Sequence, residues 1–270
     1  MKHTIITLTL AFAYLIGYAD TPLSERLQYP LYVVVSDEDL PINHELKAAF
    51  DEHWSLNPVE YIAEADYEAL SWSTPGCFLI YQKHQSVAEE GTTVYLEVLR
   101  VVCFTKGGKL VKNVAGVPIL YNEGENRQLA ITNTVRMLQD KVQFELYSEQ
   151  GESEYSNYSE KINSVSSVVK LKKLYISAQD LDDNLDFASI RALYSGEVKV
   201  VDRSYIDKLI EENSSDAYYV VVNSRQTSGF TYVNTKLIID ANNGELVYQD
   251  ETTNTQPRGF GKRDFKKLAD

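Results

Sequence analysis

The sequence predicts an α+β protein of two tandem repeated domains, each an open mixed sheet with helices packed mainly on one face. Three observations predict it. Strand-like apolar segments alternate with helical periodicities, four blocks of sequence recur in the same order, and each series ends in candidate antiparallel strands. The chain has 270 residues and is 44% hydrophobic, which is enough for two cores and excludes general disorder.

The repeat rests on four pairs of segments separated by roughly 140 residues. Residues 31–35 are echoed by 174–178, 61–70 by 200–209, 77–86 by 217–226, and 108–111 by 244–247. Identity within the pairs is low, so pattern and order carry the argument. Ordinary alternation of helices and strands is the competing interpretation.

The first domain begins with a strand at residues 31–35 and a helix that Asn43 could cap. The apolar positions of this helix are Leu46, Ala49, Phe50 and Trp54. A strand at 59–63 and a short helix at 66–72 come next, followed by a hairpin of strands 77–84 and 93–104 around a turn at 88–91. Gly107 and Gly108 then supply a tight turn into a final strand.

Cys77 and Cys103 are the two cysteines, and the predicted hairpin places them opposite each other. The same register gives two apolar pairs and one opposite-charge pair: Leu79 with Val101, Tyr81 with Leu99, and Lys83 with Glu97. Directly opposed antiparallel residues lie within the Cα distance that a disulfide accepts. We therefore expect a Cys77–Cys103 disulfide, with two buried free thiols as the alternative.

The second domain repeats this order. A helix at 187–193 and a strand at 198–201 precede a helix that Ser204 and Asp207 would start as a capping box and that runs to residue 212. A long hairpin pairs 218–223 with 232–240, and Asn243 with Gly244 turns the chain into the last strand.

Domain limits follow from the segments between the repeats. The first domain is expected to cover residues 20–147 and to close with a long amphipathic helix over 128–147, with apolar positions at Ile131, Val135, Leu138, Val142 and Leu146. Residues 148–170 are Ser-rich without periodicity and are expected to form an exposed linker. The second domain covers 171–270 and ends in a short basic helix at 262–268.

Residues 1–19 have the pattern of a secretory signal peptide. Lys2 and His3 give a basic start, residues 5–16 are apolar apart from two threonines, and Ala19 ends a small-residue cleavage site. An uncleaved anchor is the alternative, although the stretch is short for a bilayer. We expect a periplasmic or extracellular protein with no transmembrane segment in the mature chain.

The formal charge of −13 repels nucleic acid, so no nucleic-acid partner is expected, and no cofactor motif is present in the sequence. Neither a GxSxG nor a HExxH nor a Walker motif occurs, so we assign no catalytic residue and no metal ligand. The four histidines form no metal-ligand motif, and surface or capping roles are their default.

Two clusters of charged residues are candidate sites. Acidic loops follow the first strand of each repeat and contain Asp37 and Asp39 in one and Asp180 and Asp182 in the other. They could hold a cation or perform acid/base chemistry, but solvated loop charge is the simpler interpretation. The basic tail Lys262, Arg263, Lys266 and Lys267 could dock on an acidic partner or a neighbouring copy. Its alternative role is a solvated helix end whose cations face the negative pole of the macrodipole.

Three segments carry a resemblance to known proteins: VVDRSYIDKL at 200–209, AYYVVV at 217–222, and LIIDANNGELV at 237–247. They resemble the α/β domain shared by the curli-secretion lipoprotein family CsgG, the penicillin-binding-protein activator LpoB and the amino-terminal domain of TolB. The likeness covers about a third of the chain well and the first repeat weakly. It implies a scaffolding or activating role without catalysis by this domain. The lipid-attachment cysteine of the CsgG and LpoB lipoproteins is missing, and no TolB-like propeller follows.

These observations favour a non-catalytic exported protein that binds other envelope proteins or copies of itself, using sheet edges and helix faces. The rival hypothesis is an envelope hydrolase or glycan-processing enzyme that uses the acidic loops. A third is a small-molecule binder between the repeats.

Overall fold

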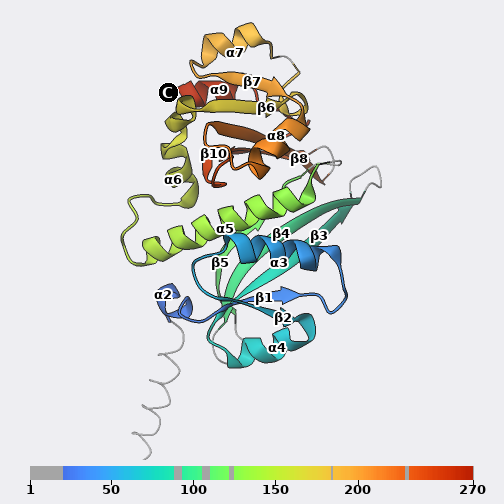
Figure 1. Ribbon diagram of the computed structural model, residues 1–270, viewed down its shortest axis with the longest axis vertical. Coiled ribbons are helices and arrows are strands. Elements are labelled where there is room, and N and C mark those ends of the chain that lie inside the picture. Colours follow the sequence, from blue (N-terminus) through green and yellow to red (C-terminus); the bar gives the residue numbers. More distant parts are fainter. Residues whose placement is uncertain are drawn as a thin grey trace, which may run out of the picture. The chain divides into compact units, whose positions relative to one another are not determined.

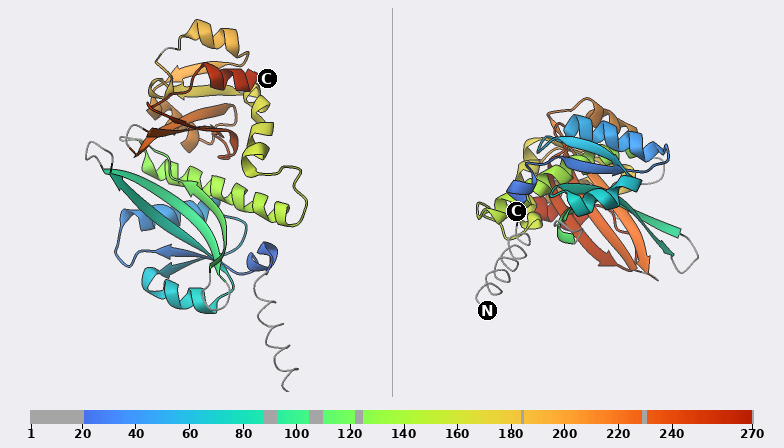
Figure 2. Two further views of the ribbon diagram at one scale, coloured as in Figure 1. Left: turned by 180° about the vertical axis from the view of Figure 1, so that it is seen from behind. Right: turned by 90° about the horizontal axis from the view of Figure 1, so that it is seen from below.

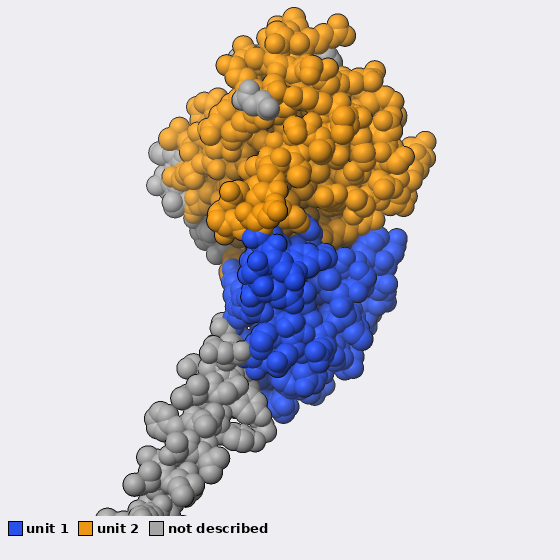
Figure 3. All heavy atoms as spheres, turned by 90° about the vertical axis from the view of Figure 1, so that its left-hand side faces the viewer, with its two compact units in different colours: residues 1–82, 98–117, 138–153 blue, residues 83–97, 118–137, 154–270 orange. Residues whose placement is uncertain are grey.

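The computed structural model describes residues 21–87, 93–104, 110–121, 125–183, 185–228 and 231–269. It contains two five-stranded sheets, ordered β2-β1-β3-β4-β5 and β10-β9-β8-β6-β7 (Figure 1). Read from its β7 edge, the second order repeats the first, so the prediction of an α+β fold with two similar mixed sheets is confirmed. The chain divides into two compact units, residues 1–82, 98–117 and 138–153, and residues 83–97, 118–137 and 154–270 (Figure 3).

The first series of elements follows the predicted order. In sequence these are α2 (Leu23–Arg26), β1 (Leu31–Val35), α3 (Pro41–His53), β2 (Val59–Ala63), α4 (Glu64–Ser73), β3 (Cys77–Val87), β4 (Thr93–Phe104), β5 (Leu110–Pro118) and α5 (Arg127–Glu149). The predicted apolar face of α5 is buried at Ile131, Val135, Leu138 and Val142. The predicted turns at 88–91 and 107–108 lie outside the described residues, as does the predicted signal peptide.

The Cys77–Cys103 disulfide joins β3 to β4, with a Cα–Cα distance of 4.3 Å. Farther along the same strands, Lys83 Nζ lies 3.8 Å from Glu97 Oε1. Both pairs are equally spaced about the same turn, as the predicted hairpin register requires. The expected disulfide is therefore present, and both cysteines are fully buried.

Asn43 does not cap the first helix, contrary to prediction. The helix begins two residues earlier at Pro41, with Leu40 at the N-cap position. Asn43 is buried, accepts from the Ser36 N–H at 3.1 Å and donates to the Glu38 carbonyl at 2.7 Å. It therefore fastens the loop after β1 to the helix, because Pro at the first helical position starts the helix without it.

The second series matches the first. It consists of α6 (Tyr158–Ser164), η1 (Ser166–Leu171), β6 (Lys173–Ser177), η2 (Ala178–Asp180), α7 (Phe187–Leu193), β7 (Val198–Val201), α8 (Arg203–Glu211), β8 (Ala217–Ser228), β9 (Thr231–Asp240), β10 (Leu246–Asn254) and α9 (Lys262–Ala269). Ser204 lies inside α8, and Asp202 holds the N-cap position without a side-chain bond, so the predicted capping box is wrong.

The segment expected to be an exposed linker is partly folded. Helix α6 and the 3₁₀ helix η1 occupy much of residues 148–170, and Ile162 and Val169 are buried. Asn157 caps α6 by accepting from the Glu160 N–H at 2.9 Å. Each of these short helices buries a single apolar side chain, which gives too little periodicity to reveal these turns from sequence.

Strand pairing supports the repeat with one local difference. Leu31 pairs with Val59 as Leu174 pairs with Val198. On the other side, Leu31 pairs with Cys77 but Leu174 pairs with Tyr218. The structural equivalent of Cys77 is thus Tyr218, one residue from the position that the sequence blocks indicate.

Helices cover both faces of the second sheet. Successive side chains of β6 alternate, so Leu174 and Ile176 join the core formed with α7 and α9, which lie next to each other (Figure 2). Tyr175 points the other way, and its ring centroid lies 5.7 Å from that of Tyr205 on α8. In the described part of the chain, no helix is long and apolar enough to cross a bilayer.

Candidate functional site

The face of the second sheet that packs against α9 changes from apolar to polar along its strands. Three successive rows cross β8, β9 and β10: Val220–Ile238–Tyr248, then Val222–Lys236–Asp250, then Ser224–Asn234–Thr252. The first row belongs to the core. The next two place charged, hydroxyl and amide groups beside the start of α9.

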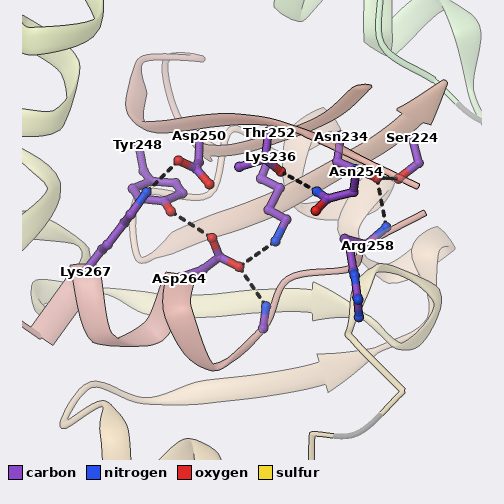
Figure 4. Close-up of polar contacts among 11 residues, drawn as sticks. Ser224, Asn234, Lys236, Tyr248, Asp250, Thr252, Asn254, Arg258, Asp264 and Lys267 are labelled. Carbon is purple, nitrogen blue, oxygen red and sulfur yellow. Dashed lines mark hydrogen bonds and ion pairs between the residues drawn. The ribbon is translucent and has the colours of Figure 1, made fainter. Parts of the chain in front are cut away.

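Asp264 of α9 joins this polar region to the core. Its carboxylate accepts from Lys236 Nζ at 2.7 Å, from the Tyr248 hydroxyl at 2.9 Å and from the Gly261 N–H at 2.8 Å (Figure 4). Asp264 is 1% exposed and Lys236 is 7% exposed. Burial, together with the negative charge of Asp264, raises the pKa of Tyr248 well above its usual value, so this hydroxyl stays protonated and donates.

A second group of contacts completes the polar surface. Lys267 Nζ bonds to Asp250, and Asn254 Nδ2 donates to Thr252 Oγ1 at 3.1 Å (Figure 4). Asn234 is fully buried, and its Oδ1 accepts from Ser224 Oγ at 2.6 Å and from the Arg258 N–H at 2.8 Å. These bonds hold the end of the sheet and the segment before α9 in one arrangement.

Two cavities open beside this surface. The larger, of about 650 Å³, is lined by residues that include Lys236, Thr252, Asn254, Arg258, Lys262 and Arg263. The smaller, of about 490 Å³, includes Asp180 and Asp183, and both cavities share Asp182 and Arg258. The structure thus places Asp182 in one cavity with Lys262 and Arg263, and Asp180 in the cavity that shares Asp182 with it, although the sequence offered these four residues as two separate candidate sites.

Backbone pairing between residues 180–182 and 259–260 produces this juxtaposition. The Phe260 N–H donates to the Asp180 carbonyl at 2.7 Å, and the Asp182 N–H donates to the Phe260 carbonyl at 3.1 Å. Gly259 permits the approach, because a Cβ at this position would lie 2.4 Å from the Leu181 carbonyl carbon. Phe260 is buried in the core between Tyr248 and Phe265 and anchors the segment.

The other candidate residues lie elsewhere. Asp37 and Asp39 are exposed and belong to the first unit, where Asp39 pairs with His44 at 2.8 Å. Lys266 is exposed, and Lys267 is engaged with Asp250. Two tail residues, Lys262 and Arg263, begin α9 at its positive pole, so the interpretation in which the tail cations all face the negative pole does not hold for them.

Asp180 has an unusual environment for a carboxyl group. It is 2% exposed, and its nearest cation is Arg203, whose Nη1 lies 3.6 Å from Asp180 Oδ2. The same guanidinium also pairs with Glu125 at 3.5 Å and with Asp207 at 3.4 Å. Burial is the main cause that raises the pKa of Asp180 to about 7; Glu125 adds to the rise, while Arg203 and the Val222 N–H oppose it.

This raised pKa predicts how stability depends on pH. An unfolded Asp titrates near pH 4, so the folded protein binds the extra proton between about pH 4 and 7 and loses stability as pH rises through that range. We expect Asp180→Asn to unfold at higher denaturant concentration than the parent at pH 8 and to lose this advantage at pH 4. Denaturant midpoints measured across this range check it, and parallel curves for the two proteins would contradict it.

The described residues contain no group of three or more His, Cys, Asp or Glu side chains that could hold a metal ion. Sequence reasoning missed Lys236, Asp264 and Asn234. A signal for the first two existed, since Lys236 directly precedes the apolar run 237–239 and Asp264 falls on the same helical face as Leu268. A charge on an apolar face indicates a buried partner.

Comparison with known proteins found no match. No protein-family model matches the chain, and neither a curated protein nor a solved structure matches it. The site is therefore interpreted from its own geometry.

Proposed function

We propose that the protein is a non-catalytic, exported binding or assembly protein of the bacterial cell envelope, and that it pairs with an envelope protein or a second copy of itself. The signal-peptide pattern and the modest resemblance to CsgG, LpoB and TolB domains support the location and the class of role. The disulfide supports export, because such bonds persist in oxidising compartments.

The observation that carries the proposal is an open sheet edge in each repeat. In the described chain, β2 and β7 each pair with one neighbour only, as do β5 and β10 at the opposite edges of the two sheets. An unpaired strand edge offers backbone donors and acceptors to an incoming strand. Glu60 and Lys199 are exposed near the middle of these strands, and charges at such positions discourage indiscriminate pairing.

The hydrogen-bond pattern shows which β7 groups are available. The Leu174 N–H donates to the Glu197 carbonyl at 2.9 Å, and Leu174 pairs with Val198. In a parallel ladder this pattern turns the backbone N–H and C=O groups of Val198 and Val200 away from β6. A proline at 200 therefore removes an outward donor without breaking the ladder.

We expect Val200→Pro to weaken self-association or capture of an envelope partner at least about tenfold, the scale of one or more lost backbone hydrogen bonds at a desolvated edge. Sedimentation velocity of the mature chain measures the first, and quantitative capture from envelope extract measures the second. Val200→Ala is the matched control, since it trims the side chain and keeps the N–H. Equal association of all three proteins, or association by none of them, would refute the proposal.

A second candidate function is hydrolysis of a glycan, favoured by Asp180. A carboxyl group whose pKa is raised to about 7 beside a cavity suits a general acid, and Asp182 and Asp183 line the same cavity. Replacing Asp180 and Asp182 by Asn would abolish turnover while leaving association intact if this function is correct. The binding or assembly function is preferred because the Asp180 carboxylate is already paired with Arg203.

A further inference from the structure

We propose that the larger cavity is a binding site for a small hydroxylated organic acid, whose carboxylate or phosphate is held by Arg258, Lys262 and Arg263. This site lies apart from the β2 and β7 edges and concerns a small ligand. It therefore goes beyond the proposed function and can fail independently of it.

The lining of the cavity carries an excess of positive charge. Of the carboxylates that line it, Asp264 is paired with Lys236 and Asp250 with Lys267. Arg258, Lys262 and Arg263 form no ion pair with any described carboxylate, so within the cavity three cations face the remaining carboxylate of Asp182. Lys262 does act at longer range on Asp186. The pKa of the Asp186 carboxyl is lowered mainly by its hydrogen bonds with Ser189 and to a smaller extent by the charge of Lys262.

Such a surplus is unexpected in this protein. The whole chain carries a formal charge of −13, so a locally cationic cavity is not the result of a generally basic composition. A local excess of one sign of charge concentrates ligands of the opposite sign.

Two of these cations also occupy an unfavourable position on α9. Lys262 and Arg263 open the helix, where the macrodipole is positive and cations cost stability. Of the residues in that turn, only Asp264 carries the negative charge that a helix N-terminus favours. Its carboxylate already accepts hydrogen bonds from Gly261 and Lys236. Cations at a helix N-terminus with no partner to offset their cost are typical of a functional position. An anion bound between these side chains would offset that cost.

Neutral polar groups also line the cavity. Thr252, Thr253 and Asn254 contribute hydroxyl and amide groups, which suit the hydroxyl groups of a ligand. Behind them, in the same row as Thr252, Asn234 is fully buried, and its Nδ2 has no acceptor within the described structure. Asn234 does not itself line the cavity, so the contact with ligand hydroxyl groups is assigned to Thr252, Thr253 and Asn254.

The volume of the cavity indicates the size of the anion that it could bind. A volume of about 650 Å³ falls within the range of small-molecule sites and far exceeds the space of one water or one inorganic phosphate. The hydroxyl and amide groups suit ligand hydroxyl groups and the cations suit an acid group, which together describe a ligand the size of a sugar acid or sugar phosphate.

Isothermal titration calorimetry of the full mature protein tests this with glucuronate, glucose 6-phosphate and neutral glucose as probes. We expect at least one of the two acids to bind and glucose not to bind, and the comparison of the acids separates a carboxylate site from a phosphate site. Arg258→Gln and Arg263→Gln should each weaken binding at least about tenfold, the usual scale for a lost charge-assisted hydrogen bond.

Lys266→Gln is the matched control. It removes one positive charge from an exposed position of the same helix that does not line the cavity, and binding should stay unchanged. Circular dichroism confirms that each variant is folded. The proposal is overturned if neither acid gives heat up to about 10 mM, if glucose binds as well as the acids, or if Arg258→Gln and Arg263→Gln bind like Lys266→Gln.

Discussion

Replacing Asp264 by alanine should lower the free energy of unfolding by about 3–5 kcal/mol, because it leaves the buried ammonium of Lys236 without its counter-ion. The Tyr248 hydroxyl and the Gly261 N–H lose their acceptor in the same substitution. Each unsatisfied buried group adds to the cost. Urea unfolding monitored by circular dichroism at pH 7 measures the change.

A double variant identifies the cause of this loss. If the unpaired charge dominates, Lys236→Met combined with Asp264→Leu should recover much of the lost stability, since apolar replacements of a buried ion pair are often neutral. A loss below about 1 kcal/mol for Asp264→Ala would show that the Lys236–Asp264 pair is not desolvated as the structure indicates.

Breaking the Cys77–Cys103 disulfide should lower stability by about 3–4 kcal/mol, the loop-closure value for a link that spans 26 residues. The bond ties β3 to β4 and restricts the unfolded chain more than the folded one. Unfolding of the parent with and without dithiothreitol measures this directly and avoids the cavity that a Cys→Ala change would leave.

The Cys77→Ala/Cys103→Ala variant is the control for reduction. Dithiothreitol should leave its unfolding curve unchanged, while the reduced parent should resemble a protein without the link. Identical curves for oxidised and reduced parent protein would mean that the thiols do not form a bond in solution.

Most of the secondary structure could be predicted from the sequence because it is encoded locally. The helix at 187–193 and the strand at 198–201 have the predicted limits, and α5 extends the predicted 128–147 by only a few residues. The errors fall at helix starts and in residues 148–170, where α6 and η1 replace much of the expected linker. Asn43 and Ser204 have the right chemistry for caps, but Leu40 and Asp202 hold the N-cap positions, because the entering loop decides which residue takes the N-cap conformation.

Only part of the candidate site could be predicted from the sequence. Its charges were recognised as an acidic loop and a basic tail, but the sequence separates them by some eighty residues, and no pattern predicts that Phe260 pairs with residues 180–182. Neither could local reasoning separate the exposed Asp37 from the buried Asp180, although both follow the first strand of a repeat. Burial is set by what packs above a loop, which is a property of the whole unit.

For this protein, local periodicity and the repeated order of segments were sufficient to predict most of the elements, the disulfide pair and the two similar sheets, because these depend largely on neighbours along the chain. Only the tertiary structure decided that Lys236 and Asp264 form a buried ion pair, that Asp180 is desolvated, and that Arg258, Lys262 and Arg263 surround one cavity. These features depend on contacts between distant segments, whose free energies are realised only once the sheet and α9 have packed together.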